Sequence, residues 1–93
     1  MITLTTDFGQ KDPFVGQVKG AIKTVNPEAD IIDITHDITR HSIKEAAIVI
    51  GLSYKYFPPR TVHLVVVDPT VGSQRRPILV STGEHYFVGP DNG

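Results

Sequence analysis

The chain has 93 residues, of which 40% are hydrophobic and 20% charged, a composition typical of one small globular domain. Its formal net charge of -1 provides no basic field for binding nucleic acid or an anionic membrane surface. Cysteine is absent, which excludes disulfides, thiol catalysis and thiolate zinc sites. No apolar run approaches the ~20 residues of a membrane span. The N-terminus also lacks the features of a secretory signal, so we expect a cytoplasmic protein.

Predicted strands and helices alternate along the first part of the chain. A strand rich in β-branched residues covers 2–6. The helix after it is predicted to start with Asp12 as N-cap and Pro13 in the first helical position, and to stop at Asn26-Pro27. A second strand is expected at 30–34.

The second predicted helix begins at Ser42, where Glu45 three residues later completes a capping box. A nearly all-apolar strand follows at 61–67, as expected where both faces of a sheet are covered. Two further strands, near 78–82 and 85–88, flank Gly83-Glu84 as a hairpin turn. This order predicts an α/β fold with a mainly parallel sheet and helices on both faces, in three layers. We expect residues 1–93 to be an incomplete N-terminal α/β domain.

In open α/β sheets, ligands bind outside the carboxyl ends of the strands, and three loops are predicted at that edge. They cover 7–12, 35–41 and 68–76. Asp7 directly follows the first strand, where a carboxylate can accept hydrogen bonds from a ribose diol or hold a cation. Asp12 is interpreted more simply as a helix cap, because Pro13 follows it.

The loop at 68–76 is the most informative segment. Asp68 stands at the end of a strand, and Arg75 and Arg76 follow seven and eight residues later. An arginine folded back on the acid would keep it ionised. Spacing alone leaves two interpretations open, a functional pair or an ion pair that only fixes the loop.

The four histidines are weak signals. His63, inside a predicted strand, is expected to be packed in the interior, and His85, at the start of a strand, to lie on the surface. His36 and His41 share one loop, but two histidines five residues apart outside a helix are poor evidence for a metal site. We therefore expect no bound metal.

Five short motifs occur in a specific order and spacing. They are Thr6-Asp7-Phe8-Gly9, Asp12-Pro13-Phe14-Val15-Gly16, Ile34-Thr35-His36, Val67-Asp68-Pro69 with Val71-Gly72, and Gly89-Pro90-Asp91-Asn92-Gly93. Together they resemble the S-adenosylmethionine hydroxide adenosyltransferase family, the adenosine-forming hydrolases related to bacterial fluorinase and chlorinase. The resemblance covers the whole chain.

The resemblance implies an N-terminal α/β domain followed by a smaller C-terminal β-barrel domain that is absent here. It also implies a homotrimer, with S-adenosylmethionine held between neighbouring subunits and no cofactor. By the same resemblance, Asp7 binds the ribose hydroxyls, and Phe8 and Asn92 are substrate-binding residues. Asp68 and Arg75 match the first two members of an Asp-Arg-His set around the attacking water. The histidine of that set would lie beyond the present chain.

The chemistry of the substrate agrees with this interpretation. Its sulfonium group departs as a neutral thioether, so the reaction mainly needs a nucleophile placed in line with the ribose 5′ carbon. Asp68 would accept a proton from water and Arg75 would stabilise the hydroxide. Halide-using relatives carry an aromatic residue where this chain has Asp68, so hydrolysis to adenosine and methionine is expected. The alternatives are a halide-dependent adenosyl transferase of the chlorinase type, and a non-catalytic protein that binds S-adenosylmethionine or a nucleoside.

Overall fold

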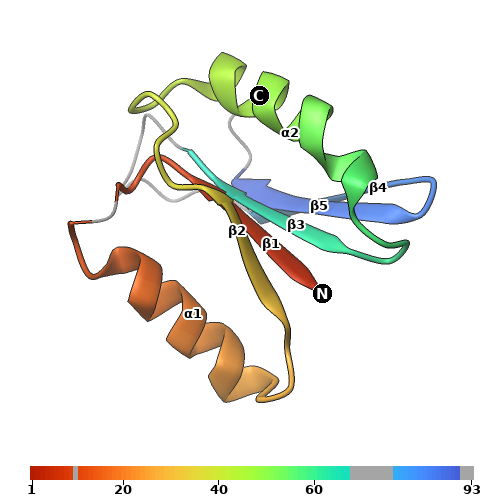
Figure 1. Cartoon of the computed structure of the whole chain (residues 1–93), viewed down its shortest axis with the longest axis horizontal. Helices are drawn as coiled ribbons and strands as arrows, with labels where there is room; N and C mark the ends of the chain where they lie inside the picture. Colours follow the sequence, from red (N-terminus) through yellow and green to blue (C-terminus); the bar gives the residue numbers. More distant parts are fainter. Residues whose placement is uncertain (10, 68–76, 91–93) are drawn as a thin grey trace.

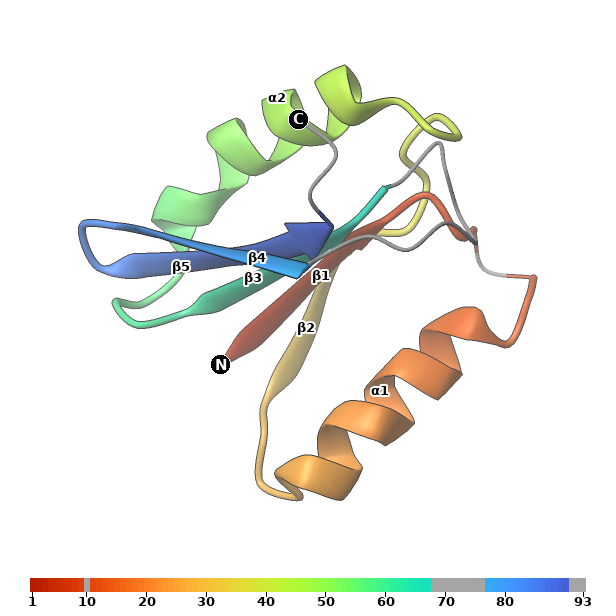
Figure 2. The same cartoon turned by 180° about the vertical axis from the view of Figure 1, so that it is seen from behind.

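The computed structural model describes residues 1–9, 11–67 and 77–90. These residues form a five-stranded sheet with a helix on each face (Figure 1). The elements in chain order are β1 (Ile2–Thr6), α1 (Phe14–Val25), β2 (Ile31–Thr35), α2 (Ile43–Ser53), the 3₁₀ helix η1 (Tyr54–Tyr56), β3 (Val62–Val66), β4 (Pro77–Thr82) and β5 (His85–Pro90). The view from behind in Figure 2 also places α1 and α2 on opposite sides of the sheet. The prediction of a three-layer α/β fold is confirmed.

The strand order is β2-β1-β3-β5-β4, which makes β1 an inner strand. It pairs in parallel with both β2 and β3, and β3 pairs in parallel with β5. Because α1 and α2 return the chain to the start of each next strand, the carboxyl ends of β1, β2 and β3 lie at one edge of the sheet. That edge is where the sequence predicts ligand-binding loops.

The last two strands form the predicted hairpin. Thr82 pairs with His85 across the two-residue turn, in which Gly83 has a φ of 56° that favours glycine. The second strand of the hairpin, β5, lies beside β3, while β4 takes the outer position. Gly89 permits this close pairing, because a Cβ there would lie 2.9 Å from the Val65 carbonyl oxygen.

The start of α1 differs from the prediction. Asp12 was expected to cap this helix, but Pro13 occupies the N-cap position and no side chain caps the first turn. The Pro13 carbonyl accepts the first helical hydrogen bond, from the Gln17 amide at 3.0 Å. The helix therefore begins one residue later than expected, and Asp12 is too far back to cap it.

The capping box at α2 is half confirmed. The Ser42 hydroxyl accepts a hydrogen bond from the Glu45 amide at 3.2 Å, as predicted. The Glu45 carboxylate does not return to the Ser42 amide; it accepts from the Thr39 amide instead. The hydrogen bonds from Thr39 hold the pKa of Glu45 below its usual value. Glu45 thus fixes the loop that precedes α2 as well as the helix.

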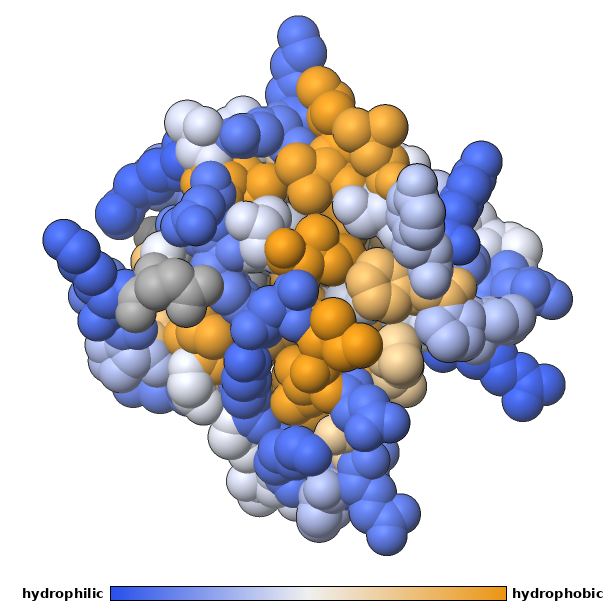
Figure 3. Space-filling view, viewed as in Figure 1, coloured by the Kyte–Doolittle hydropathy of each residue, from blue (hydrophilic) through white to orange (hydrophobic). Residues whose placement is uncertain are grey.

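A small apolar core lies between α2 and the sheet. Its buried members are Ile38, Ala46 and Val67, with Val49 and Val65 packed against them. Hydrophobic side chains gather in the middle of the face shown in Figure 3, with polar side chains around them. Ile38 belongs to the loop after β2, so this loop is anchored in the core. None of the helices in the described parts of the chain is long and apolar enough to cross a membrane.

His63 is buried at the amino-terminal part of β3, which confirms the expectation that it is packed in the interior. Its Nδ1 lies 2.7 Å from the Thr3 hydroxyl, and its Nε2 lies 3.1 Å from His85 Nδ1. Its ring stacks on Phe87 at a centroid distance of 5.1 Å. The prediction that His85 lies on the surface is wrong: His85 is half-buried, because the tight hairpin brings the start of β5 back against β3.

The partly buried contact between His63 and His85 makes the free energy of unfolding sensitive to acid. Burial, and to a lesser extent the charge of His85, lowers the pKa of His63 from its usual value of 6.5. The unfolded chain therefore binds more protons than the folded chain as the pH falls below about 6.5. We expect the free energy of unfolding to be highest above this pH and to decrease as the pH is lowered toward the folded-state pKa. Urea titrations between about pH 5 and pH 8 measure it.

His63→Gln is the control for this prediction, because glutamine does not titrate. The variant should be less stable overall, yet its stability should depend less on pH over the same range. A wild-type protein with the same pH dependence as His63→Gln would contradict the assignment.

Candidate functional site

The loops that follow β1 and β2 are joined at the carboxyl edge of the sheet. The Gly9 amide donates to the His36 carbonyl at 2.7 Å, and the Ile38 amide donates to the Thr6 carbonyl at 3.3 Å. Because Ile38 is itself buried in the core, these bonds connect the turn after β1 to the interior of the protein.

Asp7 is oriented by the loop after β2. One of its carboxylate oxygens, Oδ2, accepts a hydrogen bond from the His41 amide at 2.7 Å. His41 has a φ of 64°, a left-handed conformation that non-glycine residues rarely adopt. The amide that holds the Asp7 carboxylate therefore belongs to a residue with a strained backbone.

Asp7 and Phe8 line a pocket of about 290 Å³ at this edge. The other lining residues are Asp12, Phe14, Arg40 and His41. The rings of Phe8 and Phe14 are 5.7 Å apart at an angle of 56°. The pocket combines carboxylates and a cation with an aromatic wall, a combination suited to a ligand with both hydroxyl groups and a flat ring.

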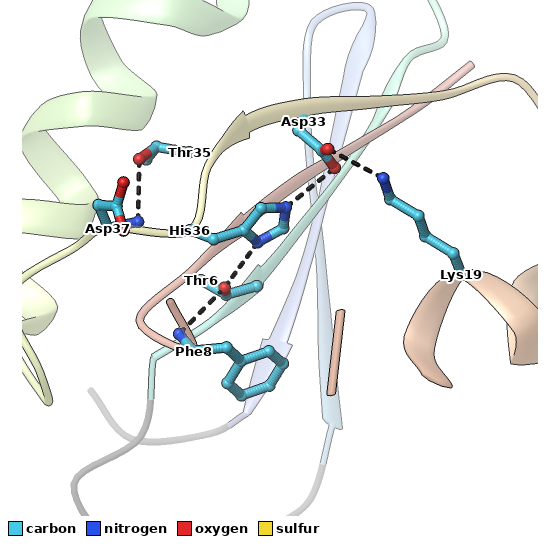
Figure 4. A network of polar contacts seen from close by, with 7 residues as sticks. All are labelled: Thr6, Phe8, Lys19, Asp33, Thr35, His36 and Asp37. Carbon is cyan, nitrogen blue, oxygen red and sulfur yellow. Dashed lines mark hydrogen bonds and ion pairs between the residues drawn. The ribbon is translucent and has the colours of Figure 1, made fainter. Parts of the chain in front are cut away.

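A buried polar network lies beneath the turn that carries Asp7 and Phe8 (Figure 4). The Thr6 hydroxyl lies 2.8 Å from His36 Nδ1, and it accepts a hydrogen bond from the Phe8 amide at 3.2 Å. On the other side of the imidazole, His36 Nε2 lies 2.9 Å from Asp33 Oδ1. The His36 side chain is completely buried, and on this side the network reaches the surface at Asp33 and its partner Lys19.

Asp33 is the charged end of this network. Its second carboxylate oxygen, Oδ2, lies 2.9 Å from Lys19 Nζ. Burial acts to raise the pKa of Asp33, but hydrogen bonds and charge from Lys19 and His36 outweigh it and leave the pKa lowered. Asp33 is therefore ionised at neutral pH, beside Lys19 and the His36 ring.

A second pocket, of about 190 Å³, lies between α2 and strands β3, β5 and β4. Its lining contains apolar side chains such as Ile50, Val80 and Phe87, and none of the described lining residues is charged. Those residues offer no side chain that could move a proton. The pocket beside Asp7 is therefore the stronger candidate for the functional site.

The remaining predicted site residues, Asp68, Arg75 and Asn92, lie outside the described residues, as does Arg76. Their roles stay predictions. Within residues 1–9, 11–67 and 77–90, no group of three or more metal-ligating side chains comes together, so His36 and His41 form no metal centre there.

Three features of the site were not predicted. Arg40 and Phe14 line the pocket, and so does Asp12, which does not cap α1. His36 was considered only as a weak metal ligand, whereas it contacts Thr6 and Asp33. The sequence offered one signal for this role: His36 directly follows a predicted strand, at the edge of the sheet that also carries the turn after β1.

Comparison with known proteins decides the family. Residues 2–93 match the SAM hydroxide adenosyltransferase N-terminal domain. The chain belongs to this family. This match confirms the resemblance seen in the sequence motifs.

Known proteins are similar to this chain along most or all of its length. The (R)-S-adenosyl-L-methionine hydrolase of Methanocaldococcus jannaschii is 49% identical, over 100% of this chain and 37% of the relative. A crystal structure of an uncharacterized conserved protein from Thermotoga maritima is 47% identical, with a TM-score of 0.94 over 100% of this chain and 36% of that one. A fluorinase of an Actinoplanes species is more distant, at 30% identity over 86% of this chain and 27% of the relative. The chain thus spans about a third of the length of the relatives it matches.

His41→Gly tests whether the left-handed backbone at His41 is strained. Glycine keeps the amide that donates to Asp7 and adopts this φ without steric cost. We expect its free energy of unfolding to equal or exceed that of the wild type, and His41→Val to be lower by ~1–2 kcal/mol, as measured by urea unfolding. A valine variant as stable as the glycine variant would show that the conformation carries no strain.

Proposed function

We propose that this chain is the nucleoside-binding part of an S-adenosylmethionine hydrolase, which uses water to form adenosine and methionine. The observation that carries the proposal is Asp7, held in a pocket beside Phe8 in a chain that matches the family throughout. As the family resemblance implies, the proposal includes a C-terminal β-barrel domain, a cytoplasmic homotrimer and no cofactor.

The carboxylate of Asp7 suits a ribose diol. The His41 amide occupies one acceptor position on Oδ2, and a carboxylate offers about four in total. Positions therefore remain on both oxygens for the 2′ and 3′ hydroxyls. Because the His41 bond already fixes the rotation of the carboxylate, less conformational freedom is lost when the ribose binds.

The aromatic rings beside Asp7 would contact the flat or apolar parts of the nucleoside. Phe8 directly follows Asp7 in sequence, and Phe14 begins the helix on the other side of the turn. Their tilted arrangement forms one wall of the pocket. A carboxylate and an aromatic wall together favour a nucleoside over a simple anion or a purely apolar ligand.

Asp68 and Arg75 are proposed to act on the water. The last paired residues of β1 and β3 are Thr6 and Val66, so the chain leaves β3 beside the turn that carries Asp7. Asp68 follows two residues later in the sequence. It would accept the proton of the attacking water, and the Arg75 guanidinium, which stays protonated, would stabilise the hydroxide formed.

The fluorinase relative keeps halide transfer as the second candidate. A carboxylate at Asp68 would repel a halide ion, which favours water as the nucleophile. The full-length enzyme, incubated with S-adenosylmethionine in ¹⁸O-labelled water, should yield adenosine with the label on its 5′ oxygen. A halogenated nucleoside formed in chloride would support the second candidate. Binding without any product would leave a non-catalytic binding protein.

Asp7→Ala should weaken adenosine binding in the full-length enzyme. Each lost hydrogen bond to the charged acceptor would cost ~1.5–3 kcal/mol, before any compensation by water. Isothermal titration calorimetry measures the affinity. Asp12→Ala removes another carboxylate from the same pocket and should have a smaller effect. Equal losses in both variants, or none in Asp7→Ala, would remove Asp7 from its proposed role.

Asp68→Asn and Arg75→Ala should lower turnover more than they weaken substrate binding, because they act on the developing nucleophile. Arg76→Ala is the matched control and should have little effect. Steady-state kinetics and calorimetry separate the two quantities. If Arg76→Ala abolishes turnover and Arg75→Ala does not, the two arginines exchange roles. If turnover is unchanged in all three variants, the acid and the arginine have no role in catalysis and form only a structural ion pair.

A further inference from the structure

Within the described residues, the His36 side chain connects β2 to the turn that carries Asp7 and Phe8. Each of its two ring nitrogens lies close to another side chain. His36 follows β2 directly and its side chain is completely buried. Nδ1 contacts Thr6 on β1, and Nε2 contacts Asp33 on β2. The hydrogen bond of Nδ1 with Thr6, and the close packing around the buried ring, hold its orientation.

The donors and acceptors of this network fit one arrangement. The Asp33 carboxylate can only accept, so His36 Nε2 carries the proton that faces it. In the neutral ring, Nδ1 then accepts from the Thr6 hydroxyl. The Thr6 oxygen keeps a lone pair for the Phe8 amide, which lies 3.2 Å away. From His36 Nδ1 to the backbone of the turn, each group has a hydrogen-bond partner of the opposite kind.

This arrangement links the interior of the sheet to the pocket. If the Thr6 hydroxyl lost His36, it would be free to rotate, and the Phe8 amide would lose a fixed acceptor. Asp7 lies between Thr6 and Phe8 in the sequence, and it lines the pocket together with Phe8. The direction of Asp7 therefore depends on the two residues that flank it.

We propose that His36 is a positioning residue: through Thr6 it holds the Asp7–Phe8 turn in the conformation that receives the nucleoside. The inference rests on the proposed function, because the nucleoside is the ligand of that proposal. His36 does not line the pocket, so it acts through Thr6 and not on the substrate.

Two pairs of variants separate this role from simple packing. His36→Asn places an amide near the position of Nδ1 and can keep the bond to Thr6, whereas His36→Gln reaches toward Asp33 and leaves Thr6 without its partner. Thr6→Val removes the hydroxyl at constant shape, and Thr6→Ser restores it. Thr24→Val is the matched control, because the Thr24 hydroxyl bonds the Gly20 carbonyl on the exposed side of α1.

The measurements are adenosine affinity, kcat and KM of the full-length enzyme, melting temperature, and the exchange rate of the Phe8 amide. We expect His36→Gln and Thr6→Val to weaken adenosine binding by ~10-fold or more, to raise KM more than they lower kcat, and to speed exchange at Phe8. Thr6→Ser and His36→Asn should recover most of the affinity. Thr24→Val should match the wild type.

The outcomes separate the two proposals. If all His36 and Thr6 variants lose melting temperature but keep wild-type adenosine affinity and KM, His36 is a packing residue and the inference is overturned. If His36→Asn is as weak as His36→Gln, the link through Thr6 is overturned. If the wild-type enzyme binds no adenosine, the proposed function is overturned. The exchange rate of the Phe8 amide in the His36 variants then shows whether His36 holds the turn.

Discussion

The parallel pairing of β1 with β2 on one side and β3 on the other determines where Asp7 and Phe8 lie. It places the carboxyl ends of the three strands at one edge, so the turn at Asp7 meets the loop at 35–41. Two backbone hydrogen bonds and the bond from His41 to Asp7 then join these loops. The pocket exists because neighbouring strands run in the same direction, and the buried Ile38 keeps the second loop in place.

The inner strand β1 is unusual for a buried strand, because Thr3, Thr5 and Thr6 are as buried as its Leu4. Two of these threonines hold histidines. Thr3 bonds His63 near the amino end of the sheet, and Thr6 bonds His36 near the carboxyl end. Alternation along a strand places Thr3 and Thr6 on opposite faces. Each face of the sheet therefore contains one buried imidazole bound to β1, one surrounded by aromatic rings and one beneath the pocket.

The sequence predicts the strands, the helices and the edge that carries the site, because hydrophobic periodicity, helix-capping residues and turn residues are local signals. It does not predict contacts between distant residues. His36 and Thr6 are 30 positions apart, and nothing in the pattern indicates that they meet. His85 was placed on the surface because the position of β5 beside β3 depends on the whole sheet. Asp7 and Phe8 line a pocket at the end of β1, a position that the fold class indicates for Asp7, and their role in binding stays a prediction.

The central claim is that the turn after β1 binds the ribose of a nucleoside. A crystal structure of the full-length protein with adenosine tests it most directly. We expect the 2′ and 3′ hydroxyls within hydrogen-bonding distance, ~2.7 Å, of the Asp7 carboxylate. The bond from the His41 amide to Asp7 should be retained, and the rings of Phe8 and Phe14 should lie against the nucleoside. Adenosine bound elsewhere, with Asp7 still bonded to His41 and contacting no ligand atom, would contradict the account.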